Sequence, residues 1–80
     1  MTLQQIRYCL TTAQVGSMNR AAEQLYVTQP ALTGAIQELE QEVGVTIFNR
    51  TNRGVTLTNE GRRFLHYARQ IYQQYEVMEQ

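Results

Sequence analysis

The side chains best suited to chemistry in this sequence are hydrogen-bonding groups at helical spacing. Gln29, Thr33 and Gln37 follow one another at intervals of four residues. This interval puts the three side chains on one face of a helix, opposite an apolar stripe. Amides and hydroxyls in such a row can hydrogen-bond to base edges in the major groove of DNA. An ordinary polar outer face has the same pattern, so the stripe alone does not decide between the two.

Two arginines form the second chemical feature. Arg50 and Arg53 lie in the turn-rich stretch 49–54, between the β-branched and aromatic runs 45–48 and 55–57. This pattern predicts a two-stranded hairpin with a basic tip. Such a wing can lie along phosphates or enter a narrow minor groove. A basic turn is common on protein surfaces, so this signal is weak alone.

Candidate catalytic groups are few and isolated. A nucleophile needs a base and an orienting group, but Cys9 stands among apolar residues and is interpreted as a small buried side chain. His66 is interpreted as a solvent-exposed helix position, and Glu38, Glu40 and Glu42 as a solvated charge run. No glycine-rich phosphate loop or metal-ligand spacing occurs. We therefore expect a binding protein without catalytic activity, metal or cofactor in this domain.

Composition limits the partners. The 80 residues, 42% of them hydrophobic, predict one small domain whose thin core would benefit from a partner subunit. Seven Arg balance seven Glu, which argues against a purely electrostatic coat for DNA or membranes. A single cysteine excludes an intrachain disulfide. No apolar run approaches the roughly 18 residues of a membrane span, so we expect a cytoplasmic protein with no membrane contact.

Apolar periodicity and end signals predict four helices. They are expected at Leu3–Val15, Ser17–Leu25, Thr28–Val43 and Thr58–Gln80. Ser17, Thr28 and Thr58 suit N-cap positions, and Gly16 and Gly44 suit C-caps. The side chains expected to be buried in the first three helices are Leu3, Ile6, Leu10, Ala13, Ala21, Ala22, Leu25, Leu32, Ala35, Ile36, Leu39 and Val43. Three helices followed by a hairpin predict a mainly α, winged helix-turn-helix domain in residues 1–57.

The last helix indicates a second copy of the chain. Its 23 residues would span about 33 Å, which is longer than a 57-residue body can cover. An apolar stripe nevertheless continues to the end of the chain. The stripe comprises Phe64, Ala68, Ile71, Tyr72, Tyr75 and Met78. We therefore expect residues 58–80 to be a linker and dimerisation helix that pairs two copies.

Several motifs occur together in a family-specific order. They are Gly16-Ser17, Ala21-Ala22-x-x-Leu25, Val27-Thr28-Gln29-Pro30-Ala31-Leu32-Thr33, Ile36-x-x-Leu39-Glu40, Val43-Gly44-Val45, Ile47-Phe48-x-Arg50 and Leu57-Thr58-x-x-Gly61. Over essentially its whole length, the chain resembles the N-terminal DNA-binding domain of LysR-type transcriptional regulators.

The resemblance implies a site and an assembly. It implies an inducible bacterial regulator, dimeric or tetrameric, that binds double-stranded DNA at an inverted-repeat operator. A larger domain, absent from these 80 residues, would bind a small-molecule effector. Base contacts are expected from Gln29, Pro30, Thr33, Gly34 and Gln37. Backbone or wing contacts are expected from Ser17, Thr28, Arg50 and Arg53.

Two positions depart from the family pattern. Gly34 stands where the family often has a longer polar or basic side chain, which removes a possible DNA contact. Cys9 stands where an aromatic residue is frequent, and we interpret this as a packing change.

The alternative function is a winged-helix interaction module that dimerises without binding DNA. Net neutrality favours the module, whereas the uncharged helix start beside an arginine tip favours DNA binding.

Overall fold

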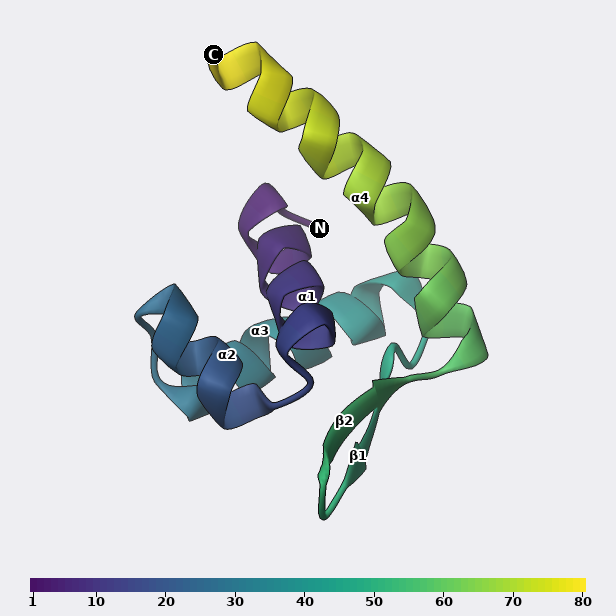
Figure 1. Cartoon of the computed structure of the whole chain (residues 1–80). Helices are drawn as coiled ribbons and strands as arrows, with labels where there is room; N and C mark the ends of the chain where they lie inside the picture. The colour runs from purple at the N-terminus through teal and green to yellow at the C-terminus, as the bar shows by residue number, and fades with distance from the viewer.

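Four helices and one hairpin make up the computed structural model, which describes residues 1–80 (Figure 1). The elements are α1 (Leu3–Val15), α2 (Met18–Leu25), α3 (Gln29–Val43), β1 (Phe48–Thr51), β2 (Gly54–Leu57) and α4 (Asn59–Glu79). Helix α1 packs against α2, α3 and α4, the hairpin projects from the helices, and α4 runs away from them (Figure 1). The predicted mainly α, winged helix-turn-helix fold is confirmed.

The helix ends follow local sequence signals. At Ser17, Thr28 and Thr58 the side-chain oxygen accepts a hydrogen bond from the backbone N–H three residues later, at 3.2, 3.2 and 2.8 Å. Gly16 and Gly44 end α1 and α3 in the left-handed conformation, with φ of 77° and 73°. These five predicted caps are therefore confirmed. The Thr28 cap fixes the residue at which α3 begins.

The core lies between the first three helices and extends to the start of the wing and to α4. The buried apolar residues are Ile6, Tyr8, Cys9, Met18, Ala21, Ala22, Leu25, Leu32, Ile36, Leu39, Ile47, Phe48, Leu65 and Ala68. The predicted inner face of α2 is confirmed, as is burial of Leu32, Ile36 and Leu39 in α3. Ala35 and Val43 are only partly buried at the edge of this core.

The predicted inner face of α1 is partly wrong. Leu3 is 36% exposed, and Leu10 and Ala13 are half-buried, whereas Cys9 and Thr12 are fully buried. The reason is that α1 has three neighbouring helices, α2, α3 and α4. Its buried arc is therefore set by their positions and does not follow the stripe of its most apolar residues. The predicted burial of Cys9 is confirmed, as is the solvent exposure of His66.

The wing begins later than predicted. Strand β1 starts at Phe48 and pairs antiparallel with β2, from Phe48 opposite Leu57 to Thr51 opposite Gly54. The predicted strand at 45–48 is therefore wrong in three of its four residues. The reason is that the backbone before Phe48 is bonded to the flanking helices, since Val45 N–H donates to the Glu40 carbonyl oxygen at 3.2 Å.

The Glu40 side chain holds the start of the wing. Its carboxylate Oε2 accepts from the backbone N–H of Ile47 at 2.7 Å and of Phe48 at 3.3 Å. The prediction that Glu40 belongs to a solvated charge run is therefore wrong, although Glu38 and Glu42 are exposed. Glu40 ties α3 to β1 by charge-assisted hydrogen bonds, which are about twice as strong as neutral ones.

Helix α4 is attached through the same segment. The Ile47 carbonyl oxygen accepts from Thr58 N–H at 3.0 Å, and the Thr58 hydroxyl donates to the Thr46 carbonyl oxygen at 2.5 Å. A Cβ atom at Gly61 would collide with that carbonyl. The helix then buries only Gly61, Leu65 and Ala68 along 21 residues, or about 31 Å. No helix in the structure is both long enough and apolar enough to cross a membrane.

Replacing Glu40 by Gln is expected to lower the free energy of unfolding by about 1–3 kcal/mol, because two backbone N–H groups lose a charged acceptor. Urea denaturation of Glu40→Gln measures the change. Glu38→Gln is the matched control, because Glu38 lies on the same helix with an exposed side chain. Its effect is expected to stay within about 0.5 kcal/mol. Equal effects of the two substitutions would show that the Glu40 bonds do not hold the wing.

Stability is also expected to depend on pH through Cys9. Burial, with the Glu40 carboxylate as the second cause, raises the pKa of the Cys9 thiol from 9.0 to about 12. The unfolded thiol therefore ionises near pH 9, whereas the folded thiol stays protonated. Its contribution to stability is full below pH 9 and is lost as the pH rises toward 12. Denaturation of the wild type and of Cys9→Ala from pH 7 to 10.5 should show a steeper loss above pH 9 in the wild type; parallel curves would contradict this.

Candidate nucleic-acid interface

The predicted polar stripe lies at the exposed N-terminal half of α3. Thr28 caps this helix, and Pro30 occupies its first turn. Gln29 and Thr33 are half-buried, whereas Pro30, Gly34 and Gln37 are exposed. At Gly34 a Cβ atom would meet nothing within 4 Å, so the missing side chain leaves open surface. The structure therefore places all five predicted base-contact residues around the outward face of this helix end.

A hydrogen-bonded group joins this stripe to the wing. The Gln29 side-chain N–H donates to Thr33 Oγ1 at 2.8 Å, and Arg50 Nη2 donates to the same oxygen at 2.7 Å. Arg50 does not lie at the tip of the wing, as predicted, but within β1 opposite Val55. The reason is that the turn is tighter than the sequence suggests and comprises only Asn52 and Arg53. The exposed Arg50 guanidinium therefore reaches back to α3.

The tip of the wing is ordered by its own hydrogen bonds and by the turn that precedes α2. The Thr51 hydroxyl accepts from Arg53 N–H and donates to the Gly54 carbonyl, both at 3.2 Å. Gly54, with φ of 132°, leaves no room for a Cβ atom because it faces the Gly16 carbonyl. Val55 N–H donates to that carbonyl at 3.1 Å. The wing thus lies beside the half-buried Ser17 cap, and Arg53 remains exposed at its end.

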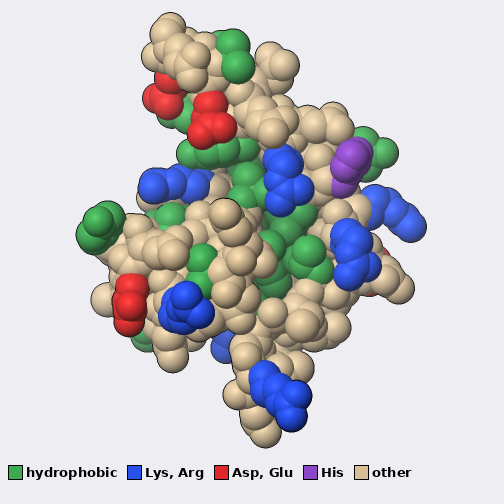
Figure 2. All heavy atoms as spheres, in the orientation of Figure 1, with side chains coloured by type: hydrophobic (Ala, Val, Ile, Leu, Met, Phe, Trp, Pro, Cys, Tyr) green, Lys and Arg blue, Asp and Glu red, His purple; other side chains and the backbone are tan.

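Charge is distributed unevenly over the molecule. No charged residue occurs from Tyr26 to Gln37, so the exposed start of α3 is uncharged. Figure 2 shows an arginine side chain (blue) at the tip of the wing, further arginines over the helical body, and acidic side chains (red) both on that body and toward the C-terminal end of α4. A neutral hydrogen-bonding surface beside a positive projection suits contact with base edges and phosphates together.

Two further exposed residues, one on α2 and one at its end, were not predicted. Asn19 is exposed and helps to line a hollow of about 140 Å³ between the starts of α2 and α3 and the wing, together with Gln29 and Arg50. Tyr26 is 94% exposed and ends α2 with φ of 59°, in the left-handed region that side chains other than glycine disfavour. Nothing in the sequence marks Asn19. The end of α2 without a glycine is the only signal for Tyr26.

The predicted dimerisation stripe on α4 divides into two faces. Ala68 is only 3% exposed and is buried in the chain's own core, with the partly buried Phe64 and Tyr72 packed against that core. The assignment of Ala68 to a surface between copies is therefore wrong, because α1 covers this side of α4. Ile71 and Met78 remain 47% and 79% exposed.

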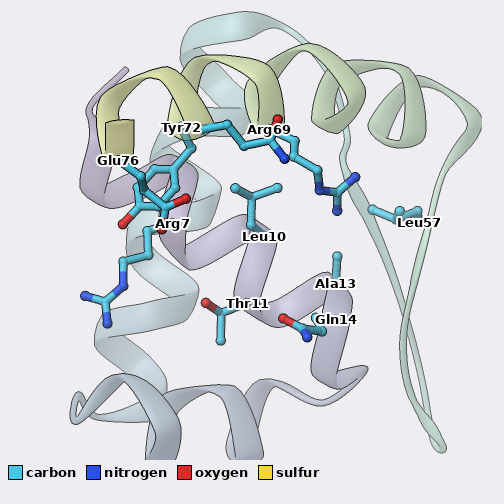
Figure 3. Close-up of a pocket in the computed structure, with 10 residues that line it drawn as sticks. Arg7, Leu10, Thr11, Ala13, Gln14, Leu57, Arg69, Tyr72 and Glu76 are labelled. Carbon is cyan, nitrogen blue, oxygen red and sulfur yellow. The ribbon is translucent and has the colours of Figure 1, made fainter. Parts of the chain in front are cut away.

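A groove of about 670 Å³ separates α1 from α4. In Figure 3, Tyr72 and Arg69 extend from α4 over Leu10 and Ala13 of α1. The half-buried state of Leu10 and Ala13 follows from this arrangement, because α4 covers them only in part. The groove adjoins the inward side of α4, away from the exposed Ile71 and Met78.

Comparison with known proteins agrees with this geometry. Residues 3–62 match the family described as "Bacterial regulatory helix-turn-helix protein, lysR family". The chain belongs to the lysR family. It is 43% identical over 77 residues, or 96% of its length, to the HTH-type transcriptional regulator ClcR of Pseudomonas putida. It spans about a quarter of the curated relatives that it matches, and 26% of ClcR.

Solved structures of the family have the same fold. A crystal structure of a CbnR DNA-binding domain in complex with DNA matches with a TM-score of 0.93 and 37% identity, over 99% of this chain and 91% of that one. A complex of the BenM DNA-binding domain with benA site 1 DNA matches with a TM-score of 0.91 and 35% identity, over 98% and 88%. The predicted family and the predicted class of DNA-binding regulatory domain are confirmed.

Proposed function

We propose that this lysR-family domain reads a short sequence of double-stranded DNA with the N-terminal half of α3 in the major groove. The base edges are contacted from the polar stripe by Gln29, Pro30, Thr33, Gly34 and Gln37. The wing lies along neighbouring phosphates or in the minor groove. The sugar–phosphate backbone is contacted at Ser17, Thr28, Arg50 and Arg53. The exposed N–H groups at the capped start of α3 favour a phosphate there as well.

The observation that carries this proposal is the link between the stripe and the wing. Arg50 bonds to Thr33, which bonds to Gln29, so the two parts form one continuous surface. Groups that are held in place before binding lose less conformational entropy when they meet a ligand. A surface with uncharged hydrogen-bonding groups and flanking arginines matches the two chemistries of duplex DNA.

Net neutrality does not oppose DNA binding, because the charge at the contact surface itself decides the attraction to phosphates. The start of α3 is uncharged and lies beside Arg50 of the wing, whereas Glu38, Glu40 and Glu42 follow in the second half of that helix. Neutrality alone favours the alternative of an interaction module that does not bind DNA. The likeness to the two DNA-binding domains whose structures are named as complexes with DNA supports DNA binding.

The exposed face of α4 supports pairing of two copies. Ile71 and Met78 share this face, and Tyr67, which is 61% exposed, extends it by one turn. Tyr75 lies at its edge, half-buried. Large apolar side chains seven residues apart on one helix fit a helix–helix seam. A homodimer joined through this face would place two wings and two α3 helices on the two halves of an inverted-repeat operator.

The domain would act within a longer regulator, by binding and not by catalysis. The chain covers only about a quarter of relatives that are named transcriptional regulators. We assign residues 1–57 to the DNA-binding unit and residues 58–80 to a linker and dimerisation helix. The rest of such a regulator would bind a small-molecule effector, allow tetramer formation and act in the cytoplasm.

Replacing Gln29 by Ala is expected to weaken binding to a selected specific duplex by about 1–3 kcal/mol, because the substitution removes a base-reading amide. Affinity for a random duplex should change little. Fluorescence anisotropy on both duplexes measures the difference. Gln41→Ala is the matched control, because Gln41 is an exposed glutamine on the other half of α3.

Equal losses on the specific and random duplexes would remove Gln29 from the base-reading surface. A protein-interaction module would bind neither duplex. A DNA-binding domain is expected to lose affinity for the random duplex as salt rises, because phosphate contacts release counterions.

Replacing Ile71 by Glu is expected to dissociate the dimer while residues 1–57 stay folded, because a charge buried in the seam is costly. Sedimentation and circular dichroism on the same sample measure both effects. Gln73→Glu is the control, since Gln73 is exposed and lies about 200° around α4 from Ile71. A dimer that persists in Ile71→Glu but dissociates in Gln73→Glu would place the seam at the α1–α4 groove.

A further inference from the structure

The Thr33 hydroxyl is one of the points where α3 and the wing are joined. Its oxygen accepts one hydrogen bond from Gln29 Nε2 at 2.8 Å and another from Arg50 Nη2 at 2.7 Å. A hydroxyl oxygen has two lone pairs and one proton. Both lone pairs are therefore occupied by this chain's own donors, and only the proton remains for an outside partner.

We propose that Thr33 acts toward DNA only as a hydrogen-bond donor, so that the base facing it must present an acceptor. Arg50 and Gln29 impose this restriction together, and Arg50 is the positioning residue that does so from the wing. The proposal rests on the proposed function, since it concerns the α3 surface that reads the major groove. Thr33 is half-buried and lies among the exposed Pro30, Gly34 and Gln37 on the outward face of this helix end.

The restriction has a definite consequence for sequence preference. A threonine hydroxyl that is free to rotate pairs with either donors or acceptors, and so distinguishes bases poorly. Guanine offers O6 and N7, adenine N7 and thymine O4 as acceptors, whereas cytosine offers only the N4 amino donor in the major groove. A Thr33 that can only donate therefore disfavours cytosine at the position it faces.

Arg50 occupies one lone pair of Thr33 whichever way the Gln29 amide is turned, and the amide decides the other. A guanidinium has donors and no acceptor, so its bond always occupies a lone pair of Thr33. An amide has both, and with the Gln29 group reversed its carbonyl would take the Thr33 proton. One lone pair would then face the groove and favour cytosine. The two arrangements predict opposite base preferences, which makes the assignment testable.

Gln29 keeps reading capacity of its own. Its Nε2 uses one proton on Thr33, which leaves the side-chain carbonyl and a second N–H proton. A carbonyl and an N–H of one amide are the pair that engages N6 and N7 of adenine. Thr33 and Gln29 would therefore contact different bases. The base preference that each side chain contributes can be separated by substituting one of them.

The experiment selects binding sites from a randomised DNA duplex library with the 80-residue chain, three single variants and one double variant. Thr33→Val removes the hydroxyl and keeps the side-chain shape, so it should flatten preference at one base position and thereby identify it. At that position the wild type should disfavour cytosine about threefold to tenfold, the range of one hydrogen bond. Arg50→Met frees a lone pair and should restore tolerance of cytosine at the same position.

Arg53→Met is the matched control, since Arg53 is the exposed wing arginine in the turn. It should lower affinity for all duplexes and leave the preference at the Thr33 position unchanged. In the Thr33→Val background, Arg50→Met should change that preference no further. Circular dichroism on each variant checks folding, which these exposed or half-buried side chains do not determine.

Three results would overturn the proposal. The first is a wild-type preference for cytosine at the position identified by Thr33→Val, which would show the reversed amide. The second is an Arg50→Met profile identical to that of the wild type at this position, which would remove the positioning role. The third is a Thr33→Val profile without any change. Failure of the wild type to select any sequence would refute the proposed function itself, and with it this inference.

Discussion

The backbone N–H and C=O of Ile47 are the groups on which the arrangement of wing and helices depends. Its N–H is bound by the Glu40 carboxylate of α3, and its carbonyl oxygen accepts from the N–H of Thr58 at the start of α4. Ile47 itself is fully buried. An unmade hydrogen bond at a buried peptide is costly. The residue therefore sets the direction of the wing relative to α3 and of α4 relative to both.

A second fixed point lies at the opposite end of the hairpin. Val55 N–H binds the Gly16 carbonyl, and Gly54 approaches that group too closely to carry a side chain. The hairpin is thus held at its base by α3 and near its tip by the α1–α2 turn. A two-stranded hairpin alone is only marginally stable. Held at both ends, it keeps Arg50 at hydrogen-bond distance from Thr33, so that strand and helix present one surface.

Local features of this fold were predictable from the sequence, whereas features set by distant contacts were not. The caps at Ser17 and Thr28 are decided within a few residues, and the inner stripe of α3 is strongly periodic. The role of Glu40 depends on which backbone N–H groups the fold leaves without partners, and no sequence pattern records that. The same holds for Ala68, which is covered by α1, and for Arg50, whose partner Thr33 is 17 residues away. The predicted stripe residues on α3 share a surface because residues three and four positions apart lie on one face of a helix.

The two wing arginines differ in what they leave available for a ligand. Arg50 uses one of its N–H groups on Thr33, while no side-chain bond restrains Arg53 at the tip. Under the proposed function, few cations then face the phosphates of one half-site. Phosphate contacts supply most non-specific affinity, so one domain alone would bind weakly. The neutral α3 stripe would add preference without adding general attraction. A second copy held through α4 would double the phosphate contacts, because the second domain would bind at a high local concentration once the first is bound. Pairing through the exposed face of α4 would therefore compensate for the small number of cations on each wing.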